Sequence, residues 1–347
     1  MTRDPALKTS LVLIAAIAAS VAAYQADTVL APLTLALFII ALVWPLQDWL
    51  KRWVPTIVAL AVTMTATILV VLAFASVVVW CFTRVGQSVI ADAAHYQAIY
   101  QAAVAWLEDR GVSIAGVWAE NITFGRMLGW AQQITSRVNT TLSFWLITLL
   151  YVVLGLMEVD DMRAKIAGSV EPDSARAFLS ASADTARKIR KYMTVRTQMS
   201  LATGALVWLF AWGVGLRFPL EWGVIAFTLN YIPFIGPFIA TLFPTLLEMA
   251  QSTSWQWILG IFIGLNIIQF VIGSYVEPRV SGAVLAISPL IVLFAVFFWT
   301  FLWGVYGAFI GVPIAIGMLT FCSHYPSTRW ISDVFGAPLP AEGRKGA

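Results

Sequence analysis

The stretch Asn230-Tyr231-Ile232-Pro233-Phe234-Ile235-Gly236-Pro237-Phe238 interrupts an apolar run that extends from Gly223 to Leu247. Each proline lacks an N–H and clashes with the preceding turn, so carbonyls about four residues upstream lose their helical partners. In hydrocarbon, such groups are tolerated only where protein or a water-filled cavity satisfies them, and this situation typically marks a substrate path. We therefore expect a broken or re-entrant helix whose pathway residues include Asn230, Pro233, Gly236 and Pro237.

The composition around this stretch is that of a membrane protein. Hydrophobic residues make up 60% of the chain and charged residues 11%, and the mean hydropathy is +0.84, whereas soluble domains carry about 25% charged residues. A helix needs about 20 apolar residues to cross the hydrocarbon core. Eight hydrophobic blocks are candidates for this role: Leu11–Tyr24, Val29–Leu46, Val54–Phe82, Leu142–Glu158, Met199–Gly215, Gly223–Leu247, Trp255–Tyr275 and Pro289–Cys322. The predicted fold is an all-α polytopic membrane protein.

These blocks predict an organisation in six parts. They are transmembrane segments 1–3 (1–83), an extracytoplasmic amphipathic helical insertion (84–141), segment 4 (142–158), a cytoplasmic basic helical loop (159–198), segments 5–8 with the Pro-Gly broken helix (199–322) and a cytoplasmic tail (323–347). The last block contains Gly304, Gly307, Gly311 and Pro313, and it is either one helix or two half-helices. At the N-terminus, Leu11 to Ala23 also resembles a cleavable signal peptide, an alternative that leaves the later topology unchanged.

The distribution of basic residues predicts on which side of the membrane each terminus lies. With a cytoplasmic N-terminus, 15 of the 21 lysines and arginines fall in inside segments and six fall outside, in agreement with the positive-inside rule. We interpret Arg187-Lys188-Ile189-Arg190-Lys191 as an anchor at the lipid headgroups. Arg196 enters the next span and is a weaker candidate for a cavity. Both termini are predicted to be cytoplasmic, and the net charge of +3 indicates contact with anionic lipid rather than with nucleic acid.

Several motifs of enzyme chemistry are missing from the sequence. It contains no phosphate-binding G-x-x-x-x-G-K-[ST] loop, no H-E-x-x-H and no Gly-rich dinucleotide turn. Cys81 and Cys322 form neither a disulfide framework nor a metal-ligand spacing. We expect no catalytic residue, metal or cofactor, which leaves a secondary transporter, a channel or a membrane scaffold.

Polar residues in the second half supply the remaining candidates. Asn266 and Gln269 share one helix face and either hold helices together or contact a substrate. Glu277 and Arg279 flank Pro278 between two apolar blocks, in a predicted loop. They form either an exposed pair or, if the loop folds into a cavity, a site at which Glu277 exchanges a proton or a cation. Glu248 is a second candidate for that exchange.

Three strings resemble the autoinducer-2 exporter family, also called PerM-type permeases. They are Leu229-Asn-Tyr-Ile-Pro-Phe-Ile-Gly-Pro-Phe-Ile, Val276-Glu-Pro-Arg-Val-Ser-Gly with Ser288-Pro-Leu, and Gly304 with Gly307-Ala-Phe-Ile-Gly-Val-Pro313. The resemblance implies a bacterial inner-membrane protein with about eight membrane segments, an extracytoplasmic insertion and homo-oligomeric assembly. It further implies export of autoinducer-2 or, in other members, sodium or lithium/proton antiport. Many members have asparagine or lysine where this chain has Arg279, so we do not assign the ion site of those members to this chain.

The combined hypothesis is a secondary transporter. Its expected cargo is a small polar organic solute such as autoinducer-2, bound by freed carbonyls and by the amides of Asn230, Asn266 and Gln269. Cation/proton antiport through Glu277 or Glu248 is the first alternative, and a passive channel or scaffold is the second. The expected partners are the solute or ion, the lipid bilayer and further copies of the chain.

Overall fold

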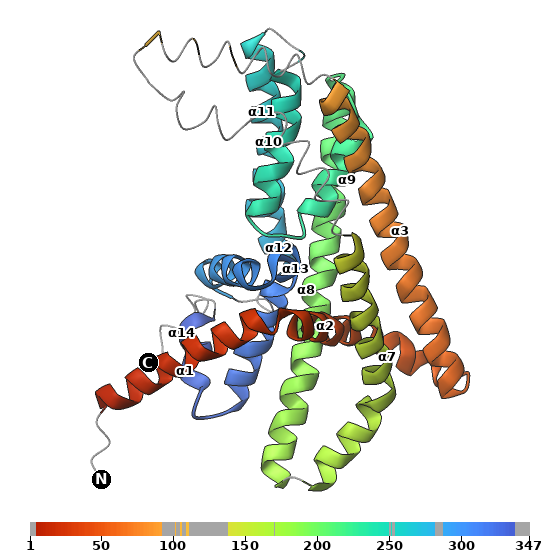
Figure 1. Cartoon of the computed structure of the whole chain (residues 1–347), viewed down its shortest axis with the longest axis vertical. Helices are drawn as coiled ribbons and strands as arrows, with labels where there is room; N and C mark the ends of the chain where they lie inside the picture. The colour runs from red at the N-terminus through yellow and green to blue at the C-terminus, as the bar shows by residue number, and fades with distance from the viewer. Residues whose placement is uncertain are drawn as a thin grey trace. The chain divides into compact units, whose positions relative to one another are not determined.

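The computed structural model describes residues 5–91, 138–169, 171–249, 251, 254–281 and 287–336, together with 101, 105, 109 and 110. Within these ranges every regular element is a helix, apart from one isolated bridge between Ile287 and Gly336 (Figure 1). The prediction of an all-α fold is therefore confirmed. Most of the predicted insertion 84–141 lies outside the described residues.

Five helical stretches in the described part of the chain are long and apolar enough to cross a membrane. They involve α2 (Asp27–Leu50), α3 (Thr56–Ala91), α7 (Val138–Ser169), α11 (Trp255–Phe270) with its continuation, and α13 (Pro289–His324). Many of their large apolar side chains point outward; Leu69, Val70 and Leu72 on α3, for example, are each more than half exposed. Because a soluble protein rarely exposes such contiguous apolar surface, these helices are suited to face lipid.

The remaining predicted blocks form shorter or mixed helices. They correspond to α1 (Pro5–Gln25), to the apolar second half of α8 (Pro172–Gly213), and to α9 (Pro219–Leu229) and α10 (Ile235–Met249). In lipid, only a helix satisfies its own backbone groups, which explains why each apolar block is helical. The polytopic interpretation with a broken segment is confirmed.

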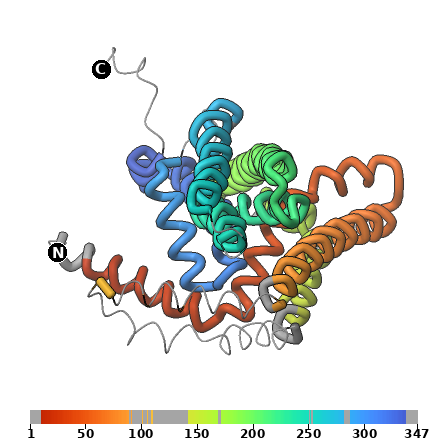
Figure 2. Tube along the Cα trace, turned by 90° about the horizontal axis from the view of Figure 1, so that it is seen from above, coloured from red at the N-terminus to blue at the C-terminus, as the bar shows by residue number. Residues whose placement is uncertain are grey.

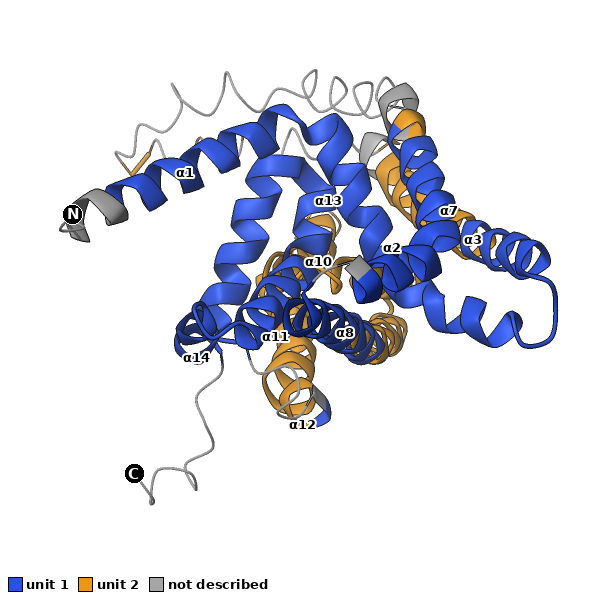
Figure 3. Cartoon of the chain, turned by 90° about the horizontal axis from the view of Figure 1, so that it is seen from below, with its two compact units in different colours: residues 1–68, 144–195, 280–347 blue, residues 69–143, 196–279 orange. Residues whose placement is uncertain are grey.

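The helices divide between two compact units, coloured separately in Figure 3. Unit 1 comprises residues 1–68, 144–195 and 280–347, and α13 packs there against α1, α2 and α14 (Arg329–Phe335). Unit 2 comprises residues 69–143 and 196–279. Its core joins α9, α10 and α11 to Val207 and Ala211 of α8, and these helices lie side by side when seen end-on in Figure 2.

In unit 2, the interrupted block folds back on itself as a helical hairpin. Helix α9 ends at Leu229, α10 begins at Ile235, and the two pack side by side in opposite directions (Figure 1). The chain reverses through Phe234, which has the left-handed φ of 64° that non-glycine residues rarely adopt. The segment is thus a helical hairpin, because α9 and α10 together do not form one continuous helix.

Unit 1 contains a second reversal, within α13. Trp303 and Gly304 leave the helical conformation, and Gly304 has a φ of 61°. The two halves contact each other, since a Cβ on Gly311 would lie 2.8 Å from the carbonyl oxygen of Ala295. The start of α13 also meets the end of α14, because the N–H of Ser288 donates to the carbonyl of Phe335 at 3.3 Å. Of the two alternatives for this block, one helix or two half-helices, the structure has two half-helices, and the break lies at Trp303 and Gly304.

Candidate polar site at the hairpin tip

The tip of the α9–α10 hairpin docks on α8 through polar side chains. Asn230 is only 4% exposed, and its Nδ2 donates to Ser200 Oγ at 3.1 Å. The neighbouring hydroxyl of Tyr231 donates to Thr197 Oγ1 at 2.9 Å. Because these partners lie three residues apart on α8, they share one face of that helix. The hairpin tip therefore meets a polar strip on α8.

An ion pair continues this strip. Arg196 precedes Thr197 on α8, and its Nη1 lies 2.7 Å from Glu277 Oε1. The side chain of Arg196 is 6% exposed and that of Glu277 is 26% exposed. Arg196 Nε is buried and has no hydrogen-bond partner among the described residues. The site thus combines a paired charge with a spare donor.

Glu277 reaches this pair from a helix, not from the predicted loop. Helix α11 continues without a gap through the π-helix η1 (Val271–Val276) into α12 (Glu277–Ser281). A π-helical turn widens the helix by about one residue and is frequent at functional sites. The expectation of an exposed or infolded loop is wrong, because residues Glu277–Ser281 are helical and continue η1 directly.

The expectation of freed backbone carbonyls at the tip is also wrong. The two carbonyls that Pro233 and Pro237 leave unpaired in an ideal helix belong to Leu229 and Pro233. The Leu229 carbonyl instead accepts the N–H of Ile232 at 2.9 Å, and the Pro233 carbonyl accepts that of Ile235 at 2.7 Å. Local turns therefore satisfy the backbone, and side chains supply the polar groups of the site.

Gly236 allows the hairpin to close. A Cβ at this position would overlap the carbonyl oxygen of Leu229, which belongs to the other arm. Gly307 plays the same part in the second hairpin, where a Cβ would overlap the carbonyl oxygen of Trp299. The structure thus places Pro233, Gly236 and Pro237 in the reversal itself and in the first turn of α10.

The other predicted site residues lie apart from the tip. Asn266 is exposed, and its Nδ2 donates to the Phe262 carbonyl of its own helix at 2.8 Å. Gln269 is half-buried, and its Nε2 has no hydrogen-bond partner among the described residues. The guanidinium of Arg279 stacks 3.5 Å from the ring centre of the exposed Tyr275. Of the eight predicted residues, Asn230 and Glu277 thus contribute side chains to the polar strip.

Sequence reasoning missed a second ion pair in unit 2. Glu221, in the first turn of α9, is 3% exposed, and its Oε1 lies 2.7 Å from Nη1 of Arg84 on α3. A glutamate directly before the apolar run of α9 was the available signal. The pair joins the far end of the hairpin to α3.

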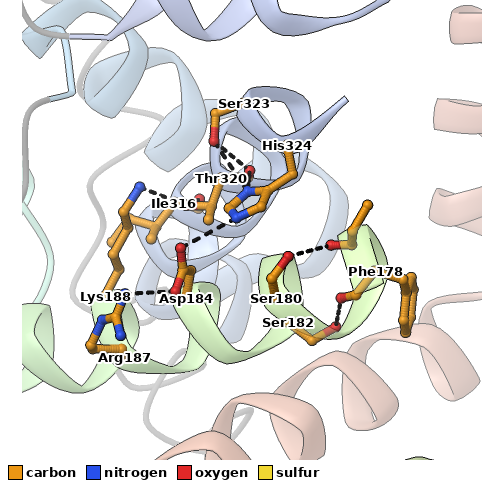
Figure 4. A network of polar contacts seen from close by, with 11 residues as sticks. Phe178, Ser180, Ser182, Asp184, Arg187, Lys188, Ile316, Thr320, Ser323 and His324 are labelled. Carbon is orange, nitrogen blue, oxygen red and sulfur yellow. Dashed lines mark hydrogen bonds and ion pairs between the residues drawn. The ribbon is translucent and has the colours of Figure 1, made fainter. Parts of the chain in front are cut away.

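Most basic residues of the cluster 187–191 on α8 form ion pairs or hydrogen bonds within unit 1 (Figure 4). Arg187 pairs with Asp184 at 2.6 Å, and Asp184 also lies 3.3 Å from His324 Nε2 of α13. Lys188 donates to Thr320 Oγ1 at 3.2 Å, and Arg190 donates to the Ala41 carbonyl at 2.8 Å. Burial lowers the pKa of Arg190, and the charge of Arg187 acts in the same direction.

Comparison with known proteins identifies the family of this chain. The family model described as AI-2E family transporter matches residues 11–327, nearly the whole chain. The chain belongs to the AI-2E transporter family. It is therefore a member of a family of membrane transport proteins.

Several bacterial transport proteins are similar to this chain. The AI-2 transport protein TqsA of Escherichia coli (strain K12) is 26% identical over 294 residues, which cover 84% of each chain. A putative transport protein of Borreliella burgdorferi is 35% identical over 169 residues, or 48% of this chain and 46% of that protein. The putative transport protein YhhT of Escherichia coli (strain K12) is 34% identical over 128 residues, or 36% of each chain.

Proposed function

We propose that this chain is an inner-membrane exporter of a small, polar, uncharged organic solute such as autoinducer-2. The observation that carries the proposal is the polar strip at the tip of the re-entrant hairpin, in which Arg196, Ser200 and Asn230 are buried. Arg196, Asn230 and Glu277 lie there in a unit whose other buried groups are mostly apolar. Buried polar groups at a broken membrane helix are typical of substrate sites in secondary transporters.

The chemistry of the strip suits a hydroxylated solute. Arg196 and Glu277 together carry no net charge, so a neutral solute needs no counter-ion there. Arg196 Nε offers a donor, and the Asn230–Ser200 and Tyr231–Thr197 hydrogen bonds can be exchanged for bonds to solute hydroxyl groups. A solute with several oxygens would thus replace each bond that it displaces. The similarity to TqsA, whose printed name is AI-2 transport protein, supports the same class of cargo.

The two hairpins support alternating access as the mode of transport. Each unit contains one hairpin, with a left-handed φ at its reversal and a close glycine contact between its arms. Re-entrant or broken helices that recur in two parts of a chain are a common design of secondary transporters. We infer that the unit 2 hairpin gates the solute and that the α13 hairpin is its counterpart.

Cation/proton antiport has less support from the described carboxylates. Glu277 and Glu221 each hold a guanidinium at 2.7 Å. A cation would have to displace that arginine, which costs several kcal/mol for a buried pair. Glu248 accepts a hydrogen bond from the indole N–H of Trp257 at 3.2 Å. Neither arrangement offers a cluster of free oxygen ligands, which a bound Na⁺ would need.

Reconstitution in proteoliposomes tests the proposal. We expect the wild-type protein to accumulate autoinducer-2, and Glu277→Gln or Asn230→Leu to reduce the initial rate at least about tenfold, since each removes a polar contact at the site. The matched control is Asp173→Asn, which breaks an exposed pair with Arg176. A sodium-driven proton flux, read with a trapped pH dye and abolished by Glu277→Gln, would replace this proposal by antiport.

A further inference from the structure

Within unit 2, α8 and the helix formed by α11, η1 and α12 contact each other in opposite directions. The ion pair between Arg196 and Glu277 joins them at one level. Phe210, 14 positions further along α8, touches α11 at Gly264, 13 positions before Glu277, because a Cβ on Gly264 would overlap the Phe210 ring. Residue numbers thus rise on one helix as they fall on the other, which defines an antiparallel register between these two levels.

The π-turn η1 brings Gln269 onto the same face as Glu277. In a regular α-helix, residues eight positions apart point about 80° away from each other. A π-turn takes up about one more residue than an α-turn, so the eight positions from Gln269 to Glu277 make about two complete turns when η1 lies between them. Gln269 therefore faces α8 together with Glu277, and its Nε2 is buried.

Thr203 occupies the corresponding position on α8. It lies seven positions, or about two turns, after Arg196 and therefore on the same face, and it is fully buried. One turn further on, Val207 packs in the same core as Leu265 of α11. Leu265 lies one turn before Gln269, so Thr203 and Gln269 stand at one level. The two helices thus have a second polar level, about 10 Å from the ion pair.

The polar groups of this second level lack hydrogen-bond partners. Thr203 Oγ1 and Gln269 Nε2 are buried and bond to no atom of the described residues, not even to each other. In native structures, buried polar groups of this kind are normally satisfied by a water molecule or a ligand. The amide N–H can only donate and the hydroxyl can donate, so one acceptor oxygen satisfies both. Because neither side chain is charged, an uncharged oxygen fits better than an anion.

We propose that Thr203 and Gln269 form a second binding position for the transported solute and hold one of its carbonyl or hydroxyl oxygens. This position presupposes the proposed function, since it requires an uncharged solute rich in oxygen. It is too far from Arg196 for a small solute to occupy both positions at once, so the solute is held at them in succession. The hydrogen bond between Asn230 and Ser200 lies between the two positions on α8, so the hairpin tip separates them.

Initial rates of autoinducer-2 uptake into proteoliposomes, measured at low concentration, test the second position. Thr203→Val keeps the shape of the side chain and removes the hydroxyl, so we expect a rate about tenfold lower, as for one lost hydrogen bond. Thr203→Ser keeps the hydroxyl and should stay within about twofold of the wild type. Gln269→Leu should resemble Thr203→Val, and the double variant should lose less than the product of the two effects, because both groups bind one oxygen.

Thr245→Val is the matched control. This buried hydroxyl of α10 already donates to the Thr241 carbonyl of its own helix at 2.8 Å, so its removal should leave uptake unchanged. Wild-type uptake with equal rates for Thr203→Val and Thr245→Val would overturn the second position alone. So would a Thr203→Ser variant as slow as Thr203→Val. A wild type that accumulates no autoinducer-2 would overturn the proposed function and the second position together.

Thermal unfolding without solute separates solute binding from a structural role. Thr203→Val should melt no lower than the wild type, because the hydroxyl forms no bond within the described residues. A lower melting temperature with unchanged uptake would assign the hydroxyl to a structural water and overturn the second position.

Discussion

At the residue scale, variants of the Arg196–Glu277 pair distinguish a role in folding stability from a role in transport. Removing one partner of a buried pair leaves a charge without compensation, whereas removing both is often close to neutral. We expect Arg196→Met to lower the free energy of unfolding by about 3 kcal/mol. The double variant Arg196→Met/Glu277→Gln should recover most of this loss and still not transport, because the polar site is gone.

Thermal unfolding in detergent and uptake of autoinducer-2 by proteoliposomes are the two measurements for this pair. Arg176→Met is the matched control, since Arg176 is 78% exposed in its pair with Asp173 and exposed pairs contribute little. If Arg196→Met and Arg176→Met melt at the same temperature, the buried pair is not structurally important. If the double variant transports normally, the site lies elsewhere.

At the element scale, each hairpin has a glycine packed against the backbone of its other arm. Gly236→Ala must push the Leu229 carbonyl away, so we expect a loss of about 1–3 kcal/mol in the free energy of unfolding, as for other overpacked sites. Gly307→Ala should cost a similar amount in unit 1. Chemical unfolding followed by tryptophan fluorescence measures both effects.

Gly260 provides the matched control for these glycines. It lies within α11, and a Cβ there would meet no atom within 4 Å. Because alanine is the better helix former, Gly260→Ala should be neutral or stabilise the protein by up to about 1 kcal/mol. Equal effects of Gly236→Ala and Gly260→Ala would argue against a tight hairpin.

At the scale of the whole molecule, the hairpins change the expected course of the chain through the membrane. A hairpin returns the chain to the side from which it came, so we expect neither α9 with α10 nor the two halves of α13 to cross the membrane. Removing two crossings leaves the predicted relation of the termini unchanged. It moves Glu248 from the predicted cytoplasmic end of its block to the opposite side.

Cysteine labelling from one side of the membrane tests this course. In a background without Cys81 and Cys322, Arg217→Cys and Gln251→Cys mark the two ends of the α9–α10 hairpin, and both positions are exposed. We expect a membrane-impermeant maleimide to label both from the same side of intact spheroplasts. Labelling of only one would mean that the block crosses. Ser288→Cys and Arg329→Cys are the corresponding pair for α13.

Composition and hydropathy were enough to predict the class of the protein and the positions of most of its helices, together with the break at Asn230–Phe238. These properties are local, because apolar length, proline and glycine act within a few residues of where they occur. The interruption at Asn230–Phe238 was predictable for this reason, whereas the last block stayed open between one helix and two half-helices.

The tertiary structure alone decided which polar groups meet. Arg196 and Glu277 are 81 positions apart, and Arg84 and Glu221 are 137 positions apart. No periodicity links such residues, so the sequence makes Arg196 only a weak candidate and gives Glu221 no role. Asn266 is predicted at the site, but its side chain bonds to its own helix. Long-range pairing depends on how the helices pack in three dimensions. Hydropathy marks which segments are buried in the membrane, but it does not specify which of their faces meet.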